Sequence, residues 1–182
     1  MSDFKPDFKS GFQPTLRPVL GKKAAIASTA IKLSPLPEGA IIHVLAAPGA
    51  ADMEVRLRSL AKGDVRAVSP GQWFIVGEEP LSHAEMTAFL AALEPQATGV
   101  DQSQGRVRIR IEGRMAERVL AKGTAVDLST AAFPVGRSAT TLIGHIAAHL
   151  TRLEGQVFEV IVLRGFAESL WDDLARMSLE FQ

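Results

Sequence analysis

The feature of this sequence that most restricts its fold is an internal duplication. The tetrapeptide Leu60-Ala61-Lys62-Gly63 recurs as Leu120-Ala121-Lys122-Gly123. An apolar segment precedes each copy, and a turn, a second apolar segment and a second helical pattern follow it. The same order of elements in both halves predicts two units of one architecture rather than one large sheet.

The first half begins with an apolar segment over residues 41–46, which predicts a strand. The next residues place apolar side chains at helical spacing and predict a helix; they are Met53, Leu57, Leu60 and Ala61. A Pro-Gly turn then leads into a second predicted strand at residues 73–76. Ser82 and Glu85 have the spacing of a capping box, so a second helix is expected to begin there.

The second half follows the same order. Residues 106–112 alternate between apolar and charged side chains, which predicts a strand with one buried and one solvent-exposed face. A helix with Met115, Val119 and Leu120 on one side follows. A tight turn precedes a predicted strand at residues 158–163, and a closing helix carries apolar residues at positions 170, 171, 174 and 177.

These patterns predict an α+β fold of two duplicated ferredoxin-like, or split βαβ, units with largely antiparallel sheets. We expect an N-terminal arm and linker over residues 1–36, a first unit over 37–103 and a second over 104–182. The second unit is longer in its middle by about 25 residues, because the repeats are 60 residues apart but the following strands are 85 apart. The inserted segment, around residues 127–151, is expected to form a β-hairpin.

Composition excludes several classes of function. Twenty basic residues balance twenty acidic ones, which argues against general nucleic-acid binding. The absence of cysteine excludes a disulfide scaffold, a thiolate metal site and a cysteine nucleophile. The N-terminus does not resemble a signal peptide, and the longest uncharged stretch, residues 138–151, is too short to span a membrane. The expected location is cytoplasmic.

Three phenylalanines, Phe4, Phe8 and Phe12, stand out in the first twelve residues. Their neighbours include proline, glycine and charged residues, which do not build a stable helix. The three side chains are therefore candidate anchors that pack on the chain's own domain or on a partner protein.

A second candidate contact is the basic row Arg106, Arg108 and Arg110 on the strand at residues 106–112. Side chains on one strand face are about 6.6 Å apart, so these three charges lie close together. They form either the solvent-exposed face of the strand, which we favour, or a surface for an anion or an acidic partner.

His145 and His149 could share a zinc ion if they lay on a helix. The run from Leu142 to Leu153 leads into a tight turn and a strand, however, so a β-hairpin is expected. Four residues along a strand span about 13 Å, which one metal ion cannot bridge. No nucleotide-binding glycine loop or serine-nucleophile motif is present either. We therefore assign no catalytic, cofactor-binding or metal-binding residue to this chain.

Several segments together resemble the gamma subunit of heterotetrameric sarcosine oxidase. The first is Arg106–Gly113, which is followed by Val119-Leu120-Ala121-Lys122-Gly123 and Val126-Asp127-Leu128. Phe133-Pro134-Val135-Gly136 and the ending Phe158–Arg164 complete the pattern. The pattern is also similar to the larger folate-binding aminomethyltransferase domains of the glycine-cleavage type.

The resemblance implies a non-catalytic subunit of a flavin-dependent complex that oxidatively demethylates sarcosine or a related N-methyl amino acid. Such a complex produces hydrogen peroxide and passes a one-carbon unit to tetrahydrofolate. FAD, FMN, NAD, tetrahydrofolate and zinc are expected in the alpha, beta and delta subunits, and no cofactor in this chain. The alternative is a small folate or one-carbon binding protein that acts alone.

Overall fold

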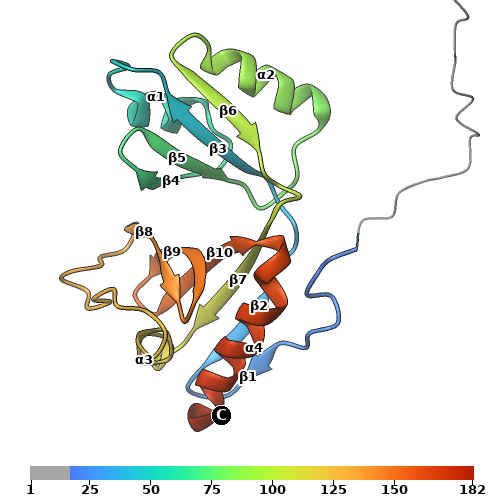
Figure 1. The fold of residues 1–182 in the computed structure, drawn as a ribbon, viewed down its shortest axis with the longest axis vertical. Coiled ribbons are helices and arrows are strands. Elements are labelled where there is room, and N and C mark those ends of the chain that lie inside the picture. The colour runs from blue at the N-terminus through green and yellow to red at the C-terminus, as the bar shows by residue number, and fades with distance from the viewer. Residues whose placement is uncertain (1–16) are drawn as a thin grey trace, which may run out of the picture.

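The computed structural model describes residues 17–182, and its first unit is a four-stranded antiparallel sheet with two helices (Figure 1). The elements are, in chain order, β3 (Ile41–Ala46), α1 (Met53–Leu60), β4 (Asp64–Ser69), β5 (Gln72–Val76), α2 (His83–Leu93) and β6 (Ala97–Asp101). The strand order β4-β5-β3-β6 is that of a ferredoxin-like unit, as predicted. The capping box is also confirmed, because the Ser82 hydroxyl accepts from the Glu85 N–H at 3.3 Å and the Glu85 carboxylate accepts from the Ser82 N–H at 2.9 Å.

The second unit repeats this plan with a longer middle. Its elements are β7 (Arg106–Glu112), α3 (Ala116–Ala121), β8 (Ser138–Ile143), β9 (Ile146–Glu154), β10 (Val157–Leu163), a short 3-10 turn (Arg164–Phe166), α4 (Ala167–Ser178) and a final 3-10 turn (Leu179–Phe181). The added segment contributes β8, which pairs with β9 across a tight turn at Gly144 and His145. This hairpin spans residues 138–154 and so overlaps the segment 127–151, in which a β-hairpin was expected, from residue 138 onwards.

The second sheet contains two strands from the N-terminal segment that we expected to be a linker. These are β1 (Ile26–Ala27) and β2 (Lys32–Pro35), and the full strand order is β1-β2-β7-β10-β9-β8. In the first unit, β6 lies on the outer side of β3; in the second unit, β2 takes the equivalent place beside β7. A strand from before the first unit, β2, therefore completes the second sheet.

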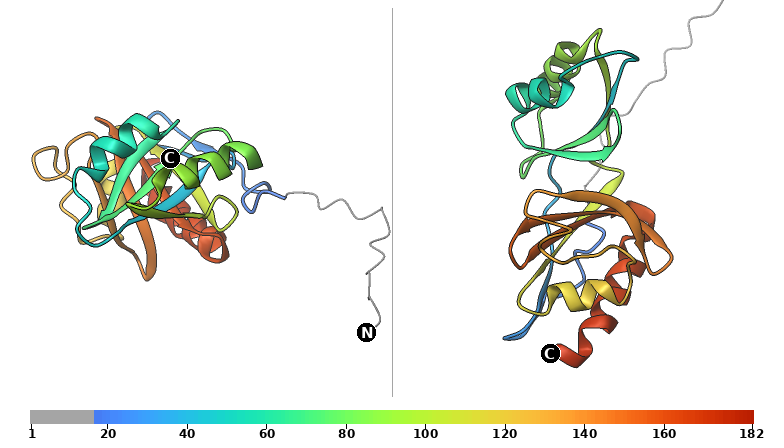
Figure 2. Two further views of the ribbon diagram at one scale, coloured as in Figure 1. Left: turned by 90° about the horizontal axis from the view of Figure 1, so that it is seen from above. Right: turned by 90° about the vertical axis from the view of Figure 1, so that its left-hand side faces the viewer.

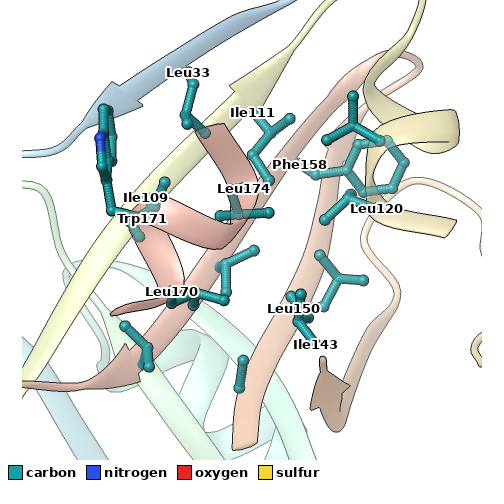
Figure 3. Close-up of a cluster of buried hydrophobic side chains, with 14 of the residues drawn as sticks. Leu33, Ile109, Ile111, Leu120, Ile143, Leu150, Phe158, Leu170, Trp171 and Leu174 are labelled. Atoms are coloured by element: carbon teal, nitrogen blue, oxygen red, sulfur yellow. The ribbon is translucent and has the colours of Figure 1, made fainter. Parts of the chain in front are cut away.

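The two sheets face each other, and each carries its helices on its far side (Figure 2). The order of layers is α1 and α2, the first sheet, the second sheet, and then α3 and α4. The larger core lies between the second sheet and its helices, where buried side chains from strands and helices meet (Figure 3). Residues that anchor it include Leu33, Ile109, Ile111, Leu120, Leu150, Phe158, Leu170, Trp171 and Leu174.

The closing helix α4 shows why this core forms. Leu170, Trp171 and Leu174 lie on one face at helical spacing and are at most 3% exposed. Its opposite face carries charged residues such as Asp172, which pairs with Lys23 at 2.6 Å. Among residues 17–182, no helix combines the length and the apolar character that a membrane crossing requires.

Candidate functional site

Both sheets contribute side chains to the surface on which the two units meet. Ile41, Phe74 and Val76 of the first unit form a buried cluster with Ile161 of β10. Phe74 lies at its centre and is 2% exposed. The face of the second sheet that lies away from α3 and α4 is therefore covered by the first unit.

A buried carboxylate, Glu159 of β10, lies at this interface among three arginines. Its oxygens are 2.7 Å from Arg66, 3.3 Å from Arg110 and 3.7 Å from Arg108. Glu159 has no exposed surface, and it lies directly opposite Arg110 in the β7–β10 pair. Because Arg66 comes from β4, this group of charges links the two units across their interface.

Arg108 makes a second link between the units. Its guanidinium donates to both carboxylate oxygens of Glu78, which follows β5, at 3.0 and 3.1 Å. These hydrogen bonds lower the pKa of Glu78, so its carboxylate stays ionised at neutral pH. We call Arg66, Arg108, Arg110, Glu78 and Glu159 the interface charge cluster.

The basic row predicted from the sequence therefore lies against this chain's own first unit. Arg108 is 2% exposed, so the solvent-exposed face that we favoured is wrong for this residue. Arg106 stacks its guanidinium 4.6 Å from the centroid of the Phe74 ring and donates to the Gln102 side chain. The alternative interpretation was a surface for an anion or an acidic partner; in the structure, Glu159 and Glu78 of this same chain supply the acidic groups.

His149 of β9 is buried beside the same cluster. Its ring contacts Phe74 edge-on at 5.1 Å, and its Nδ1 lies 3.2 Å from the Thr140 hydroxyl. Its Nε2 has no hydrogen-bond partner among residues 17–182. Burial, helped by the positive charges of Arg66 and Arg106, lowers the pKa of His149 to about 4, so the ring is neutral at neutral pH.

Acid should therefore destabilise the folded chain through His149. The pKa of His149 is about 4 in the folded chain, whereas its ordinary value is 6.5. As the pH falls below 6.5, the unfolded chain therefore takes up the proton before the folded chain does. The free energy of unfolding should fall by about 3 kcal/mol between neutral pH and pH 4. Urea unfolding at a series of pH values measures this loss.

The matched variants for this experiment are His149→Gln and His145→Gln, since His145 is exposed in the β8–β9 turn. Only His149→Gln should reduce the dependence of the free energy of unfolding on pH. A weaker pH dependence should remain in this variant, because burial also lowers the pKa of His43. Equal slopes in both variants would contradict this role for His149.

The metal site weighed for His145 and His149 depended on a helix, but both residues belong to the β8–β9 hairpin, as expected. His145 lies exposed in its turn and His149 is buried in β9. Within residues 17–182 there is no group of three or more potential metal ligands.

A pocket of about 660 Å³ opens in the first unit, between α1, α2 and the adjoining ends of β3 and β5. Ile42, Ile75 and Phe89 line it with apolar surface, and acidic residues at its edge are Asp64, Glu78, Glu79 and Glu85. Among the described lining residues the single cation is Lys62, which pairs with Glu85 at 2.9 Å. We call this the α2 pocket; no sequence pattern pointed to it.

Helix α2 beside the pocket is unusually apolar for its exposure. Within this fully described helix only Leu93 is buried. Ala88 and Ala91 are exposed, and Phe89 and Leu90 are partly exposed. A helix with so little charge is ordinarily covered by other protein.

Comparison with known families identifies the chain. Residues 39–180 match the family model described as the sarcosine oxidase, gamma subunit family. The chain belongs to this family. The match confirms the resemblance that the sequence motifs indicated. It extends over both units and contains the whole interface charge cluster and the α2 pocket, whereas β1 and β2 precede it.

Solved structures include a similar chain. It belongs to the heterotetrameric sarcosine oxidase from Corynebacterium sp. U-96 in complex with pyrrole 2-carboxylate. The two chains share 22% sequence identity with a TM-score of 0.79, over 91% of this chain and 96% of that chain. At this identity the likeness shows that this gamma-subunit family member shares the fold of that chain. No curated protein sequence matches the chain.

The α2 pocket of this gamma-subunit family member offers a folate no unpaired cation among its described lining residues. Folates carry a negatively charged glutamate tail, and the acidic lining residues Asp64, Glu78 and Glu85 are already ion-paired. Lys62, the cation among the described lining residues, is already paired with Glu85. The predicted contacts Phe4, Phe8 and Phe12 lie outside the described residues.

Proposed function

We propose that this chain is the non-catalytic gamma subunit of a heterotetrameric, flavin-dependent sarcosine oxidase-like complex. The family match over residues 39–180 carries this proposal. The complex would oxidatively demethylate sarcosine or a related N-methyl amino acid. It would release hydrogen peroxide and pass the one-carbon unit to tetrahydrofolate.

The described side chains support a structural role. Three strongly buried ionisable groups, Arg66, Arg108 and Glu159, take part in ion pairs that cross the interface between the units, Arg66 with Glu159 and Arg108 with Glu78. Arg152, which is fully buried, pairs with Glu117 inside the second unit. His149 has a lowered pKa and lies beneath Phe74 and Thr140, where a substrate has no access to it. The groups at the interface stabilise the contact between the two units, which is a structural role.

The partners proposed for this chain are the alpha, beta and delta subunits of such a complex. FAD, FMN, NAD, tetrahydrofolate and zinc would be bound by those subunits. In this arrangement, the choice of N-methyl substrate is made outside this chain. The exposed apolar side of α2 is consistent with a protein that other chains cover.

Co-expression with candidate flavoprotein subunits tests the proposal. After size-exclusion chromatography in mild salt, we expect the chain to elute with the flavin-containing fraction and its oxidase activity. Flavin content per large subunit should be the same in preparations that lack this chain, because the cofactors belong to the partners. Elution of the chain alone, with stable and fully active oxidase in the other fraction, would overturn the proposal.

The alternative of a folate or one-carbon binding protein that acts alone makes the opposite prediction. Calorimetry with tetrahydrofolate on the isolated chain separates the two. A gamma subunit with an acidic pocket edge should give no measurable heat of binding. Binding tighter than the millimolar range, without partner subunits, would favour the alternative.

A further inference from the structure

We propose that Arg106 and the surface around it bind a carboxylate of a partner subunit, in a segment of that subunit that also carries apolar side chains. The surface consists of His43, Val100, Arg106 and Leu163, and we call it the Arg106 rim. It lies where β6 leads into β7 and the chain passes from the first unit to the second (Figure 1). The inference rests on the proposed function, because the partner is another subunit of that complex.

The residues of the Arg106 rim form one continuous row. Val100 of β6 lies opposite His43 of β3 in the first sheet. The His43 ring contacts the Phe74 ring at 5.0 Å, and the Arg106 guanidinium lies 4.6 Å from the centroid of the same Phe74 ring. Leu163 is directly opposite Arg106 in the β7–β10 pair. Opposite residues of neighbouring strands point to the same face, so the row connects the first sheet with the second.

Arg106 differs from the other arginines of its strand because it has no carboxylate partner within residues 17–182. Arg108 and Arg110 pair with carboxylates of the interface charge cluster. The Arg106 Nε donates to the Gln102 side chain, and its two terminal nitrogens make no hydrogen bond in the described part of the chain. Arg106 is only partly buried, so an approaching group can reach it.

The charges near Arg106 leave its own charge uncompensated. The nearby carboxylate of Asp101 accepts hydrogen bonds from Ser103 at 2.9 and 2.6 Å, and Glu38 is held in its own ion pair at 2.8 Å. Burial lowers the pKa of His43, so its ring is neutral at neutral pH. Burial also lowers the pKa of Arg106. Its guanidinium is therefore partly removed from water without a carboxylate that offsets the loss of hydration.

Exposed apolar side chains lie beside this cation. Val100 is 46% exposed and Leu163 is 45% exposed. The two terminal nitrogens of a guanidinium can donate two hydrogen bonds to one carboxylate. Apolar neighbours that a partner covers keep water away from such a pair, which strengthens it. The Arg106 rim therefore fits an acidic residue with apolar neighbours and disfavours a basic segment.

Titration of this chain into the complex of the other subunits tests the proposal. Arg106→Gln should weaken binding at least about tenfold, and its dissociation constant should depend less on salt than that of the wild-type chain. Arg114→Gln is the matched control, since Arg114 is exposed just beyond the other end of β7 and makes no ion pair within residues 17–182. It should bind as the wild-type chain does.

A second pair of variants leaves Arg106 itself unchanged. Leu163→Glu places a carboxylate directly opposite Arg106 in the same chain, where it competes with the carboxylate of the partner. Leu163→Gln has the same shape without the charge. Leu163→Glu should therefore bind at least about tenfold more weakly than Leu163→Gln.

The outcomes separate this inference from the proposed function. If the wild-type chain does not bind the other subunits, the proposed function fails and this inference fails with it. If the wild-type chain binds and Arg106→Gln binds equally well, only this inference is overturned. An equal loss in Arg114→Gln, or equal binding by the two Leu163 variants, would also overturn it. Urea unfolding of each isolated variant shows whether it is folded, and the Leu163 pair decides if Arg106→Gln is not.

Discussion

Replacing Glu159 by glutamine should lower the free energy of unfolding by about 3–5 kcal/mol. Glu159 is fully buried, and its carboxylate is the shared partner of Arg66 and Arg110, with Arg108 nearby. A neutral amide of the same shape leaves these buried positive charges poorly compensated. Urea unfolding at neutral pH, followed by circular dichroism, measures the loss.

Glu54→Gln is the matched control, because Glu54 pairs with Arg58 one turn away on the exposed side of α1 at 2.7 Å. That change should cost less than about 1 kcal/mol. Equal effects of the two variants would show that the interface charge cluster contributes no more than an ordinary surface pair.

Phe74→Ala should lower the free energy of unfolding by a similar amount, about 3–5 kcal/mol. Phe74 fills the space between the two sheets and contacts the rings of His43 and His149 at 5.0 and 5.1 Å. Removing it leaves a cavity between two rigid sheets that cannot close around it. Thermal and urea unfolding measure the change.

The control for this variant is Phe166→Ala, since Phe166 is 52% exposed. This variant should lose little free energy of unfolding. In Phe74→Ala, NMR titration should also show the pKa of His149 moving up towards its ordinary value, as water reaches the ring. An unchanged histidine pKa together with a small stability loss would show that Phe74 does not seal the interface.

The ferredoxin-like units could be predicted because their signals are local. Repeated Leu-Ala-Lys-Gly segments, helical spacing in residues 53–60 and 170–174, and the Ser82 cap each depend on neighbours in sequence. The family could be predicted for the same reason, since its motifs are contiguous segments of the second unit. The strand order of the first sheet then follows from the known topology of such units.

The covered face of β7 could not be predicted from its own pattern. Alternating charged and apolar residues look the same whether the charged face meets water or a second sheet with matching charges. A signal did exist in β10, where Glu159 is the one acid in the otherwise apolar run of residues 157–163. Such an isolated charge in a buried strand needs a partner, and the arginines of β7 were available.

The strands β1 and β2 were missed because they are short and lack a clear periodicity. They contain two and four residues, and β2 ends at Pro35. β2 pairs with β7, more than seventy positions later in the sequence, and β1 in turn pairs with β2. The α2 pocket was missed for a related reason, because its lining comes from four separate segments.

The pairing of β2 with β7 also constrains the order in which this chain can fold as it is synthesised. Leu36 donates its N–H to the Arg108 carbonyl at 3.1 Å, so the whole first unit occupies the place of a hairpin loop. When synthesis reaches Asp101, all strands of the first sheet are present, but β7, the partner of β2, is not. The second sheet cannot be completed until β10, which ends at Leu163, has been synthesised. A nascent chain can thus close the inserted unit first and then add the second unit around it, as in domain-by-domain folding on the ribosome.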